Sequence, residues 1–281
     1  MELWDYETRK KTRFDVDFKR SNKVWNKYHL NKRYNIGHTM ALIKDCKPRN
    51  IKQWQDYYEK SGKEAYELKH KARFGSFAEL RDYVCLINST YGKTKEDLTE
   101  LAKEFQDCLT AEGIDLDLET CFNHVYIRAV DETYLGYQRE QTAFRNLNNF
   151  CKKEGLILKE TDETDDILFG VDYEVFKNEK LIAGIQVKGS IYRDAVQQKS
   201  EYTAIEESDK LLQNLNNQYS KAKKVPVLYA YITKYFTLEG DDVFNELINL
   251  RDNKDSLDEK LEGKKCVNSS AISEKNINID R

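Results

Sequence analysis

Hydrophobic residues recur at intervals of three and four along most of the first half of the chain. This spacing occurs in IKQWQDYYEKSG, SFAELRDYVCLI and KEDLTELAKEFQDCL, between Pro48 and Thr110. Because an α-helix makes a turn about every 3.6 residues, the spacing gathers the apolar side chains on one face and predicts three amphipathic helices. Thr94 and Asp97 have the spacing of a capping box, so we expect them to cap the third helix.

The pattern changes in the second half, where helical stretches alternate with short apolar strands. GYQREQTAFRNLNNFCKKEGL predicts a helix that ends near Gly155, and LILK predicts a strand. Two further strands follow between residues 170 and 192, then the helical stretch IEESDKLLQNLNNQYSKAK, the strand VPVLYAYIT and the short helical stretch DVFNELINL. The order helix, three strands, helix, strand predicts an α/β (α+β) core.

The chain therefore divides into three predicted regions. Residues 1–130 form a mainly helical region, residues 131–252 form the mixed core, and residues 253–281 form a tail. The tail has no aromatic residue and is rich in Lys, Asp, Glu, Asn and Ser, a composition that predicts flexibility.

Charge is unevenly distributed, although the net charge of the chain is only −3. Residues 8–60 contain fifteen Lys or Arg and five Asp or Glu, a local charge of +10. Such a run is an electrostatic footprint for a polyanion such as nucleic acid, but a solvated basic face without a partner has the same composition. The charge alone leaves both readings open.

Six cysteines are scattered through the chain without a CxxC pair or closely spaced histidines, which argues against a zinc site and indicates buried thiols. No apolar run approaches the roughly 18 residues that span a bilayer, and no signal peptide precedes the first helix. We expect a cytoplasmic protein with no membrane partner. A Gly-Lys-Thr tripeptide begins at Gly92, but Ile87 stands where a phosphate-binding loop needs its first glycine.

Ionisable and amide side chains interrupt two otherwise apolar strands in GVDYEVFKNEKLIAGIQVKGSIY, residues 170–192. Side chains alternate between the faces of a strand, so Asp172 and Glu174 share one face and Gln186 and Lys188 share one face of the next strand. The two polar faces coincide only if facing residue numbers add to an even total such as 358. A plain two-residue turn would give an odd total. We therefore predict a three-residue or bulged connection.

A second acid precedes the strands. Glu140 continues the apolar stripe of its helix, formed with Phe144, Leu147 and Cys151, although an ionised group on a packing face is costly unless it is paired or bound to a cation. Carboxylate and amide oxygens hold hard divalent cations such as Mg²⁺, and a lysine beside the cation orients water and offsets charge on a phosphate. Phosphodiester hydrolysis uses these groups.

These residues and the order of elements resemble the PD-(D/E)XK nuclease superfamily. Asp172 is followed after thirteen residues by Gln186-Val187-Lys188, with Glu140 on the preceding helix. The resemblance covers about residues 136–233 and implies a mixed sheet flanked by helices. Within the superfamily the stretch is most similar to MjaI-type type II restriction endonucleases, and the Gln form of the triplet is also similar to Mrr-like nucleases.

By this resemblance Asp172 is the central metal ligand, Gln186 stands at the second acidic position, and Lys188 is the catalytic lysine. Glu140 is the helix acid that binds the cation directly or through water. Gln186 departs from the usual carboxylate, and this leaves open a helper role for Glu174, Asp165 or Asp166, or a damaged site.

The resemblance implies a Mg²⁺-dependent restriction endonuclease, with Mn²⁺ as a substitute, that cleaves double-stranded DNA at a short palindrome of the CTAG kind and leaves 5′-phosphate and 3′-hydroxyl ends. A homodimer suits a two-fold symmetric target. A cognate DNA methyltransferase is expected as a separate protein in the same prokaryotic cytoplasm. The helical region supplies the candidate DNA contacts: Arg9, Lys10, Lys11, Arg13, Lys19, Arg20, Lys23, Lys32, Arg33 and Arg49. The alternatives are a structure-selective or modification-dependent nuclease with the same core, and an inactive DNA-binding protein.

Overall fold

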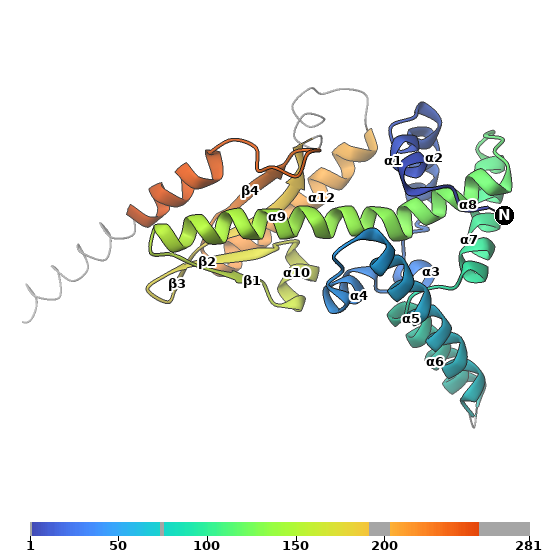
Figure 1. The fold of residues 1–281 in the computed structure, drawn as a ribbon. Helices are drawn as coiled ribbons and strands as arrows, with labels where there is room; N and C mark the ends of the chain where they lie inside the picture. The colour runs from blue at the N-terminus through green and yellow to red at the C-terminus, as the bar shows by residue number, and fades with distance from the viewer. Residues whose placement is uncertain (1, 74–75, 191–202, 253–281) are drawn as a thin grey trace, which may run out of the picture. The chain divides into compact units, whose positions relative to one another are not determined.

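The computed structural model describes residues 2–73, 76–190 and 203–252 (Figure 1). The chain divides into two compact units, residues 1–138 and residues 139–281. The predicted tail, residues 253–281, lies outside the described residues. So does Cys266.

The first unit is helical. Its core contains the buried rings of Trp25, Trp54, Phe105 and Phe122. The three amphipathic helices predicted between residues 48 and 110 are confirmed as α5, α6 and α7. The helices of this unit are α1 (Tyr6–Thr12), α2 (Val16–Lys27), α3 (Arg33–Ile36), α4 (Thr39–Cys46), α5 (Ile51–Lys71), α6 (Phe77–Thr90), α7 (Lys95–Ala111) and α8 (Leu118–Tyr126).

Short polar residues define where these helices begin. The capping box predicted at α7 is confirmed, because the Thr94 hydroxyl accepts from the Asp97 backbone N–H and the Asp97 carboxylate accepts from the Thr94 backbone N–H. Lys93, in the Gly-Lys-Thr tripeptide, is buried and donates to the carbonyl of Asn88 at 2.8 Å. Burial lowers the pKa of Lys93 to about 8. The tripeptide is thus built into the junction before α7.

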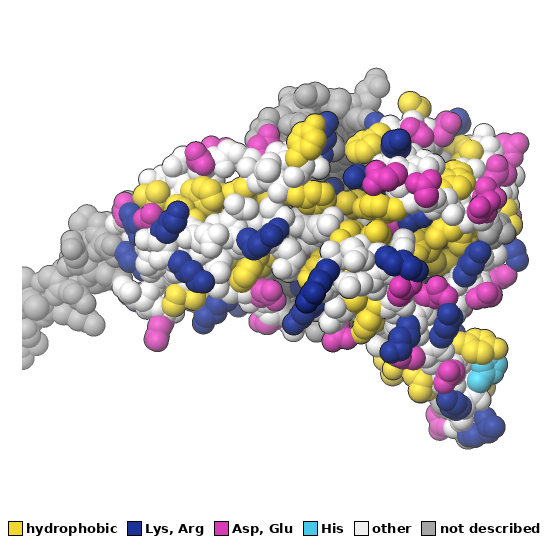
Figure 2. All heavy atoms as spheres, in the orientation of Figure 1, with side chains coloured by type: hydrophobic (Ala, Val, Ile, Leu, Met, Phe, Trp, Pro, Cys, Tyr) yellow, Lys and Arg dark blue, Asp and Glu magenta, His cyan; other side chains and the backbone are white. Residues whose placement is uncertain are grey.

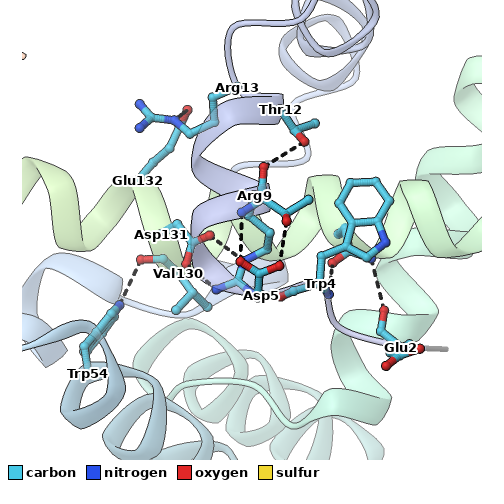
Figure 3. Close-up of polar contacts among 12 residues, drawn as sticks. Glu2, Trp4, Asp5, Arg9, Thr12, Arg13, Trp54, Val130, Asp131 and Glu132 are labelled. Carbon is cyan, nitrogen blue, oxygen red and sulfur yellow. Dashed lines mark hydrogen bonds and ion pairs between the residues drawn. The ribbon is translucent and has the colours of Figure 1, made fainter.

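A π-helix, Ile127–Asp131, joins α8 to α9 (Glu132–Lys153). Wider turns of this kind disturb the regular hydrogen-bond ladder and leave backbone groups in need of other partners. Here the indole Nε1 of Trp54 donates to the carbonyl of Val130 at 2.9 Å (Figure 3). The π-turn is therefore held by a buried side chain from α5.

The second unit contains a four-stranded mixed sheet with the order β1-β2-β3-β4. β1 pairs with β2 and β2 with β3 in antiparallel fashion, whereas β3 and β4 are parallel. The elements are β1 (Ile157–Glu160), α10 (Glu163–Phe169), β2 (Tyr173–Lys177), β3 (Lys180–Gly189), α12 (Thr203–Lys223) and β4 (Val227–Ile232), followed by helical residues 242–252. Because α9 precedes these elements in the chain, the predicted α/β class and the predicted order of core elements are confirmed.

Helix α10 is an addition to the predicted order. Its acidic stretch lacks an apolar repeat, so periodicity gives no signal for it. The carboxylate of Asp162 accepts from the backbone N–H of Asp165 at 2.9 Å, which is an N-cap contact. Gly170, with φ +66°, follows the helix in the left-handed conformation that commonly ends helices.

Each face of the sheet packs on different side chains. On the α9 face, Leu147 and Cys151 are buried with Val175 and Ile185. On the other face, Tyr219 of α12 is buried with Val171 and Val225. The alternation of strand side chains therefore separates a fully apolar face from the face that also carries the polar residues.

The prediction of buried thiols holds only in part. Cys121 and Cys151 are buried, but Cys85 on α6 is exposed and Cys46 and Cys108 are partly exposed. The apolar repeat of α6 predicts a buried face, but Leu86 and Phe77 on this helix are exposed as well. The exposure of Cys85 therefore does not follow from the repeat. Among the described residues, no helix is long and apolar enough to cross a membrane.

Candidate active site

Asp172 lies immediately before β2, between the end of β1 and the middle of β3. Its backbone N–H donates to the carbonyl of Ile185 at 2.9 Å, and its carbonyl accepts from the N–H of Thr161 at 3.1 Å. The backbone of Asp172 therefore continues the hydrogen-bond ladder in both directions. This places its side chain beside the middle of β3.

The predicted bulged connection between β2 and β3 is confirmed. Near the turn Lys177 faces Lys180, but Val175 faces Ala183, and the register shifts between Val175 and Phe176. The turn itself is the two-residue type, with positive φ at Asn178 and Glu179, as hairpins with a right-handed twist prefer. The extra residue of the bulge changes the facing total from odd to even.

The shifted register brings Asp172 and Gln186 together. The amide Nε2 of Gln186 donates to Asp172 Oδ2 at 2.8 Å, and the backbone N–H of Val187 donates to the same oxygen at 2.6 Å. Two donors converging on one oxygen favour its ionised form. The acid and the amide of the motif thus form one hydrogen-bonded unit.

The amide oxygen of Gln186 is left without a donor. Gln186 is 4% exposed, and its Oε1 is buried and accepts no hydrogen bond within the described part of the chain. The nearest glycine gives it room, because a Cβ on Gly170 would lie 3.2 Å from Oε1 and 2.7 Å from a methyl of Leu212 on α12. A buried polar atom without a partner costs roughly 1–3 kcal/mol. A cation or water next to Oε1 would remove that cost.

Lys188 and Glu140 lie on elements that lead to the same end of the sheet. Lys188 follows Gln186 by two residues on β3, so both occupy the same face, and it is half-buried. The hydroxyl of Tyr173 donates to the backbone carbonyl of Glu140 at 3.0 Å. That bond holds the turn of α9 that carries Glu140 against the start of β2, next to Asp172.

Glu174 and Asp165 have other partners. The Tyr219 hydroxyl donates to Glu174 Oε1 at 2.6 Å, and burial together with this bond raises the pKa of Tyr219 well above its ordinary value. Glu174 thus has a tyrosine from α12 as its partner. Asp165 forms an ion pair with Lys223 at 2.6 Å, and the side chain of Asp166 lies outside the described residues.

Sequence reasoning missed the polar side chains that α12 and β4 add to this face. Asn216 Nδ2 donates to the hydroxyl of Tyr229 at 2.6 Å, and Tyr229 is the β4 residue paired with Gln186. Asn216 and Tyr219 are spaced by three residues and are both buried on α12. That spacing of polar side chains within an otherwise apolar stripe was the available signal.

The residues present are suited to a hard cation. Asp172 and Glu140 carry carboxylate oxygens and Gln186 carries a buried amide oxygen without a described donor, and these are the kinds of oxygen that would hold Mg²⁺. Among the residues the structure describes, no three His, Cys, Asp or Glu side chains gather as a metal-binding group.

Two of the ten candidate DNA contacts are engaged inside the helical unit. Arg9 is 2% exposed and binds Asp131 through Nε at 2.6 Å and Nη2 at 3.0 Å, while Nη1 donates to the carbonyl of Trp4 (Figure 3). Arg13 is half-buried and pairs with Glu132 at 3.7 Å. The charge of Arg9 is neutralised in the core, so Arg9 is not available to a polyanion.

The other eight candidates are exposed: Lys10, Lys11, Lys19, Arg20, Lys23, Lys32, Arg33 and Arg49. On the face shown in Figure 2, basic side chains of the helical unit are interspersed with acidic ones. The run of positive charge in the sequence is therefore not one continuous basic surface in this view.

Comparison with known proteins adds a family. A family model described as MjaI restriction endonuclease matches residues 21–234. Neither a curated protein nor a solved structure matches the chain. The matched range runs from within α2 to just past β4 and includes every residue of the candidate active site.

Proposed function

Because the chain belongs to the MjaI restriction endonuclease family, we propose that it is a Mg²⁺-dependent type II enzyme that cleaves double-stranded DNA at a short palindromic site. Family membership makes it a restriction nuclease with DNA as its substrate. The finer features are the proposal: the cation, the symmetric target and the ends produced. A CTAG-like target rests on the family resemblance alone.

One observation carries the proposal. The bulge in the β2–β3 hairpin brings Asp172 and Gln186 into hydrogen-bond contact and places Lys188 on the same face. A hairpin without the bulge would direct the two polar pairs to opposite faces. The same shift aligns Tyr173 and Val175 with Ala183 and Ile185 in the apolar cluster on the other face, so the bulge serves both the site and the core.

Each residue has a role that follows from its chemistry. Asp172 and Glu140 provide carboxylate oxygens and Gln186 provides an amide oxygen for a divalent cation, which polarises the phosphate and lowers the pKa of a bound water. Lys188 orients the attacking water and offsets negative charge on the phosphate oxygens. Water attacks phosphorus in line with the bond to the 3′ oxygen. As that bond breaks, the attacking water gives up a proton to solvent and the leaving 3′ oxygen takes one from solvent, so a 5′-phosphate and a 3′-hydroxyl remain.

Gln186 must turn its amide to act as a ligand. Its Nε2 faces Asp172 and its Oε1 faces away, toward Gly170. Because an ionised carboxylate only accepts hydrogen bonds, the nitrogen is the atom that faces Asp172 while no cation is bound. Rotation of the amide by about half a turn would direct Oε1 to a cation shared with Asp172.

The assembly proposed is a homodimer, because a two-fold symmetric protein places equivalent active sites on the two strands of a palindrome. A separate methyltransferase of the same specificity would protect host DNA in the prokaryotic cytoplasm. Mn²⁺ would substitute for Mg²⁺, because both accept oxygen ligands.

A second candidate function has its own observation. The contact of Gln186 Nε2 with Asp172 satisfies the carboxylate without a cation. A site that is stable in this state is compatible with a protein that binds DNA and does not cleave it. Activity measurements separate the two functions.

The test is cleavage of phage DNA with Mg²⁺ by the wild type, by Lys188→Ala and by Lys180→Ala. Lys180 is an exposed lysine at the other end of β3, so its substitution removes the same charge from the same strand. We expect discrete fragments from the wild type and Lys180→Ala, and a loss of at least about 100-fold in rate for Lys188→Ala. Fragment ends that map to one palindrome support site-specific restriction.

Other outcomes decide against the proposal in distinct ways. Tight DNA binding without cleavage under Mg²⁺, Mn²⁺ or other divalent cations supports the inactive binding protein. Cleavage only at branched or modified DNA supports the other nucleases of this fold. Equal activity of Lys188→Ala and the wild type removes Lys188 from the site.

A further inference from the structure

Arg139, on α9, lies against the end of β3. If Gly189 carried a Cβ, its three nearest atoms would all belong to this guanidinium: Nε at 3.5 Å, Cζ at 3.6 Å and Nη2 at 3.9 Å. These are ordinary van der Waals distances, so the guanidinium lies beside the end of β3, on the face to which a side chain at position 189 would point. Arg139 is half-buried.

The contact places a fixed positive charge at the end of the sheet that carries the candidate active site, on the face of β3 opposite to Lys188. Gly189 directly follows Lys188 on β3, and Arg139 directly precedes Glu140 on α9. The bond from the Tyr173 hydroxyl to the Glu140 carbonyl holds this same turn of α9 against the start of β2. Two contacts, one with β2 and one with β3, thus fix the turn at the sheet end that carries Asp172.

Charge and shape both indicate an anionic ligand. Among the described residues at this end of the sheet, Lys188 and Arg139 bring two positive charges beside the carboxylates of Asp172 and Glu140, and a divalent cation would add to the positive charge that attracts phosphates. A guanidinium presents parallel N–H donors that match two oxygens of a phosphate, and it keeps its charge at any pH at which the protein folds. The position of Arg139 beside the end of β3 orients that fork.

We propose that Arg139 binds a backbone phosphate of DNA next to the bond that is cleaved. The inference rests on the proposed function, because it assumes DNA at this end of the sheet. It assigns Arg139 to a phosphodiester neighbouring the one at Lys188. The predicted helical region is not required for this contact, since Arg139 belongs to the unit that contains the sheet.

The test is binding of an end-labelled phage DNA fragment, with Ca²⁺ in place of Mg²⁺ to prevent cleavage, across a series of salt concentrations. Arg139→Ala should weaken binding by about tenfold. The slope of log K against log salt should become shallower by about 0.9, the value for one phosphate contact. Arg139→Lys should keep the slope and lose part of the affinity, because the charge remains without the fork.

Arg145 provides the matched control. It is an exposed arginine on the same helix and donates to the carbonyl of Gln141 through Nε at 3.3 Å. Arg145→Ala should leave the salt slope unchanged. Should Arg139→Ala fail to fold, Gly189→Leu displaces the guanidinium while keeping Arg139, and it should weaken binding to a similar extent.

The outcomes separate this inference from the proposed function. If the wild type cleaves DNA and Arg139→Ala keeps its affinity and slope, the inference is wrong and the function stands. If the wild type never cleaves but Arg139→Ala shows the shallower slope, the phosphate contact stands and the catalytic proposal fails. Equal losses in Arg139→Ala and Arg145→Ala overturn the inference, because they indicate general electrostatics. A wild type that neither cleaves nor binds DNA overturns both.

Discussion

Replacing Gln186 with Glu tests the geometry of the candidate site directly. The substitution keeps the shape of the side chain but replaces the NH₂ group, which donates to Asp172 Oδ2 at 2.8 Å, with a carboxylate oxygen. Without a cation, two carboxylates then face each other at hydrogen-bonding distance in a buried position. They cannot both ionise without a large cost, so they share a proton.

The size of the effect has two parts. The lost hydrogen bond to a charged group costs about 1.5–3 kcal/mol. The repulsion between the two carboxylates has an upper limit, because one of them can take up a proton instead. Protonating a carboxyl with an ordinary pKa of about 4.3 costs about 4 kcal/mol at pH 7.5. The shared proton restores part of the lost bond, so we expect Gln186→Glu to be about 2–5 kcal/mol less stable than the wild type in EDTA at pH 7.5.

The sign of the pH dependence follows from the raised pKa. A carboxyl whose pKa is higher in the folded than in the unfolded protein binds a proton on folding, and this contribution is lost as the pH rises through the folded pKa. The deficit of the variant should therefore shrink by about 1.4 kcal/mol per unit as the pH falls from 7.5 toward 5. Saturating Mg²⁺ or Ca²⁺ should remove it, because a cation satisfies both carboxylates.

Urea unfolding followed by circular dichroism measures this difference. Tryptophan fluorescence provides an internal reference, because Trp4, Trp25 and Trp54 all belong to the helical unit. Gln218→Glu, an exposed substitution on α12, controls for the added charge. A Gln186→Glu variant as stable as this control in EDTA, with no dependence on pH, would refute the contact between Gln186 and Asp172.

Two further predictions concern the helical unit. Asp131→Asn leaves the guanidinium of Arg9 buried without its counter-charge, so the free energy of unfolding should fall by about 3–5 kcal/mol. Urea titrations followed by tryptophan fluorescence measure this, and a loss below about 1 kcal/mol would indicate that the pair is solvated. Burial lowers the pKa of His124 to about 3, so its contribution to stability is complete above about pH 6.5 and is lost as the pH falls toward 3. Between pH 5 and pH 3 the free energy of unfolding of His124→Phe should fall less steeply than that of the wild type, by on the order of 1 kcal/mol per pH unit. If the two proteins lose stability in parallel as the pH falls, His124 titrates normally.

Much of the fold was accessible from local patterns. The three-and-four spacing of α5, α6 and α7 and the alternation in β2 and β3 repeat with the periods of single elements, so each can be read without knowing its neighbours. The polar pairs on β2 and β3 also predicted how these two strands are paired. Because they needed a common face, they implied the irregular hairpin that the structure contains.

Features that depend on a distant partner were not accessible in this way. Arg9 has the sequence context of a surface arginine, yet it is buried because Asp131, 122 residues away, lies opposite it. Glu174 looked available to a cation until Tyr219 was found to donate to it. In both cases the identity of the residue is local information and its partner is not.

The amino-acid sequence was sufficient for the types and order of the core elements, the even register of the hairpin and the choice of Asp172, Gln186 and Lys188 as candidates. Only the tertiary structure brought the amide of Gln186 against the carboxylate of Asp172, and only it placed Arg139 beside Gly189. The physical reason is the range of the interactions. Periodicity is set by backbone geometry within one element, whereas the direction of a polar side chain depends on donors, charges and free space supplied by segments far along the chain.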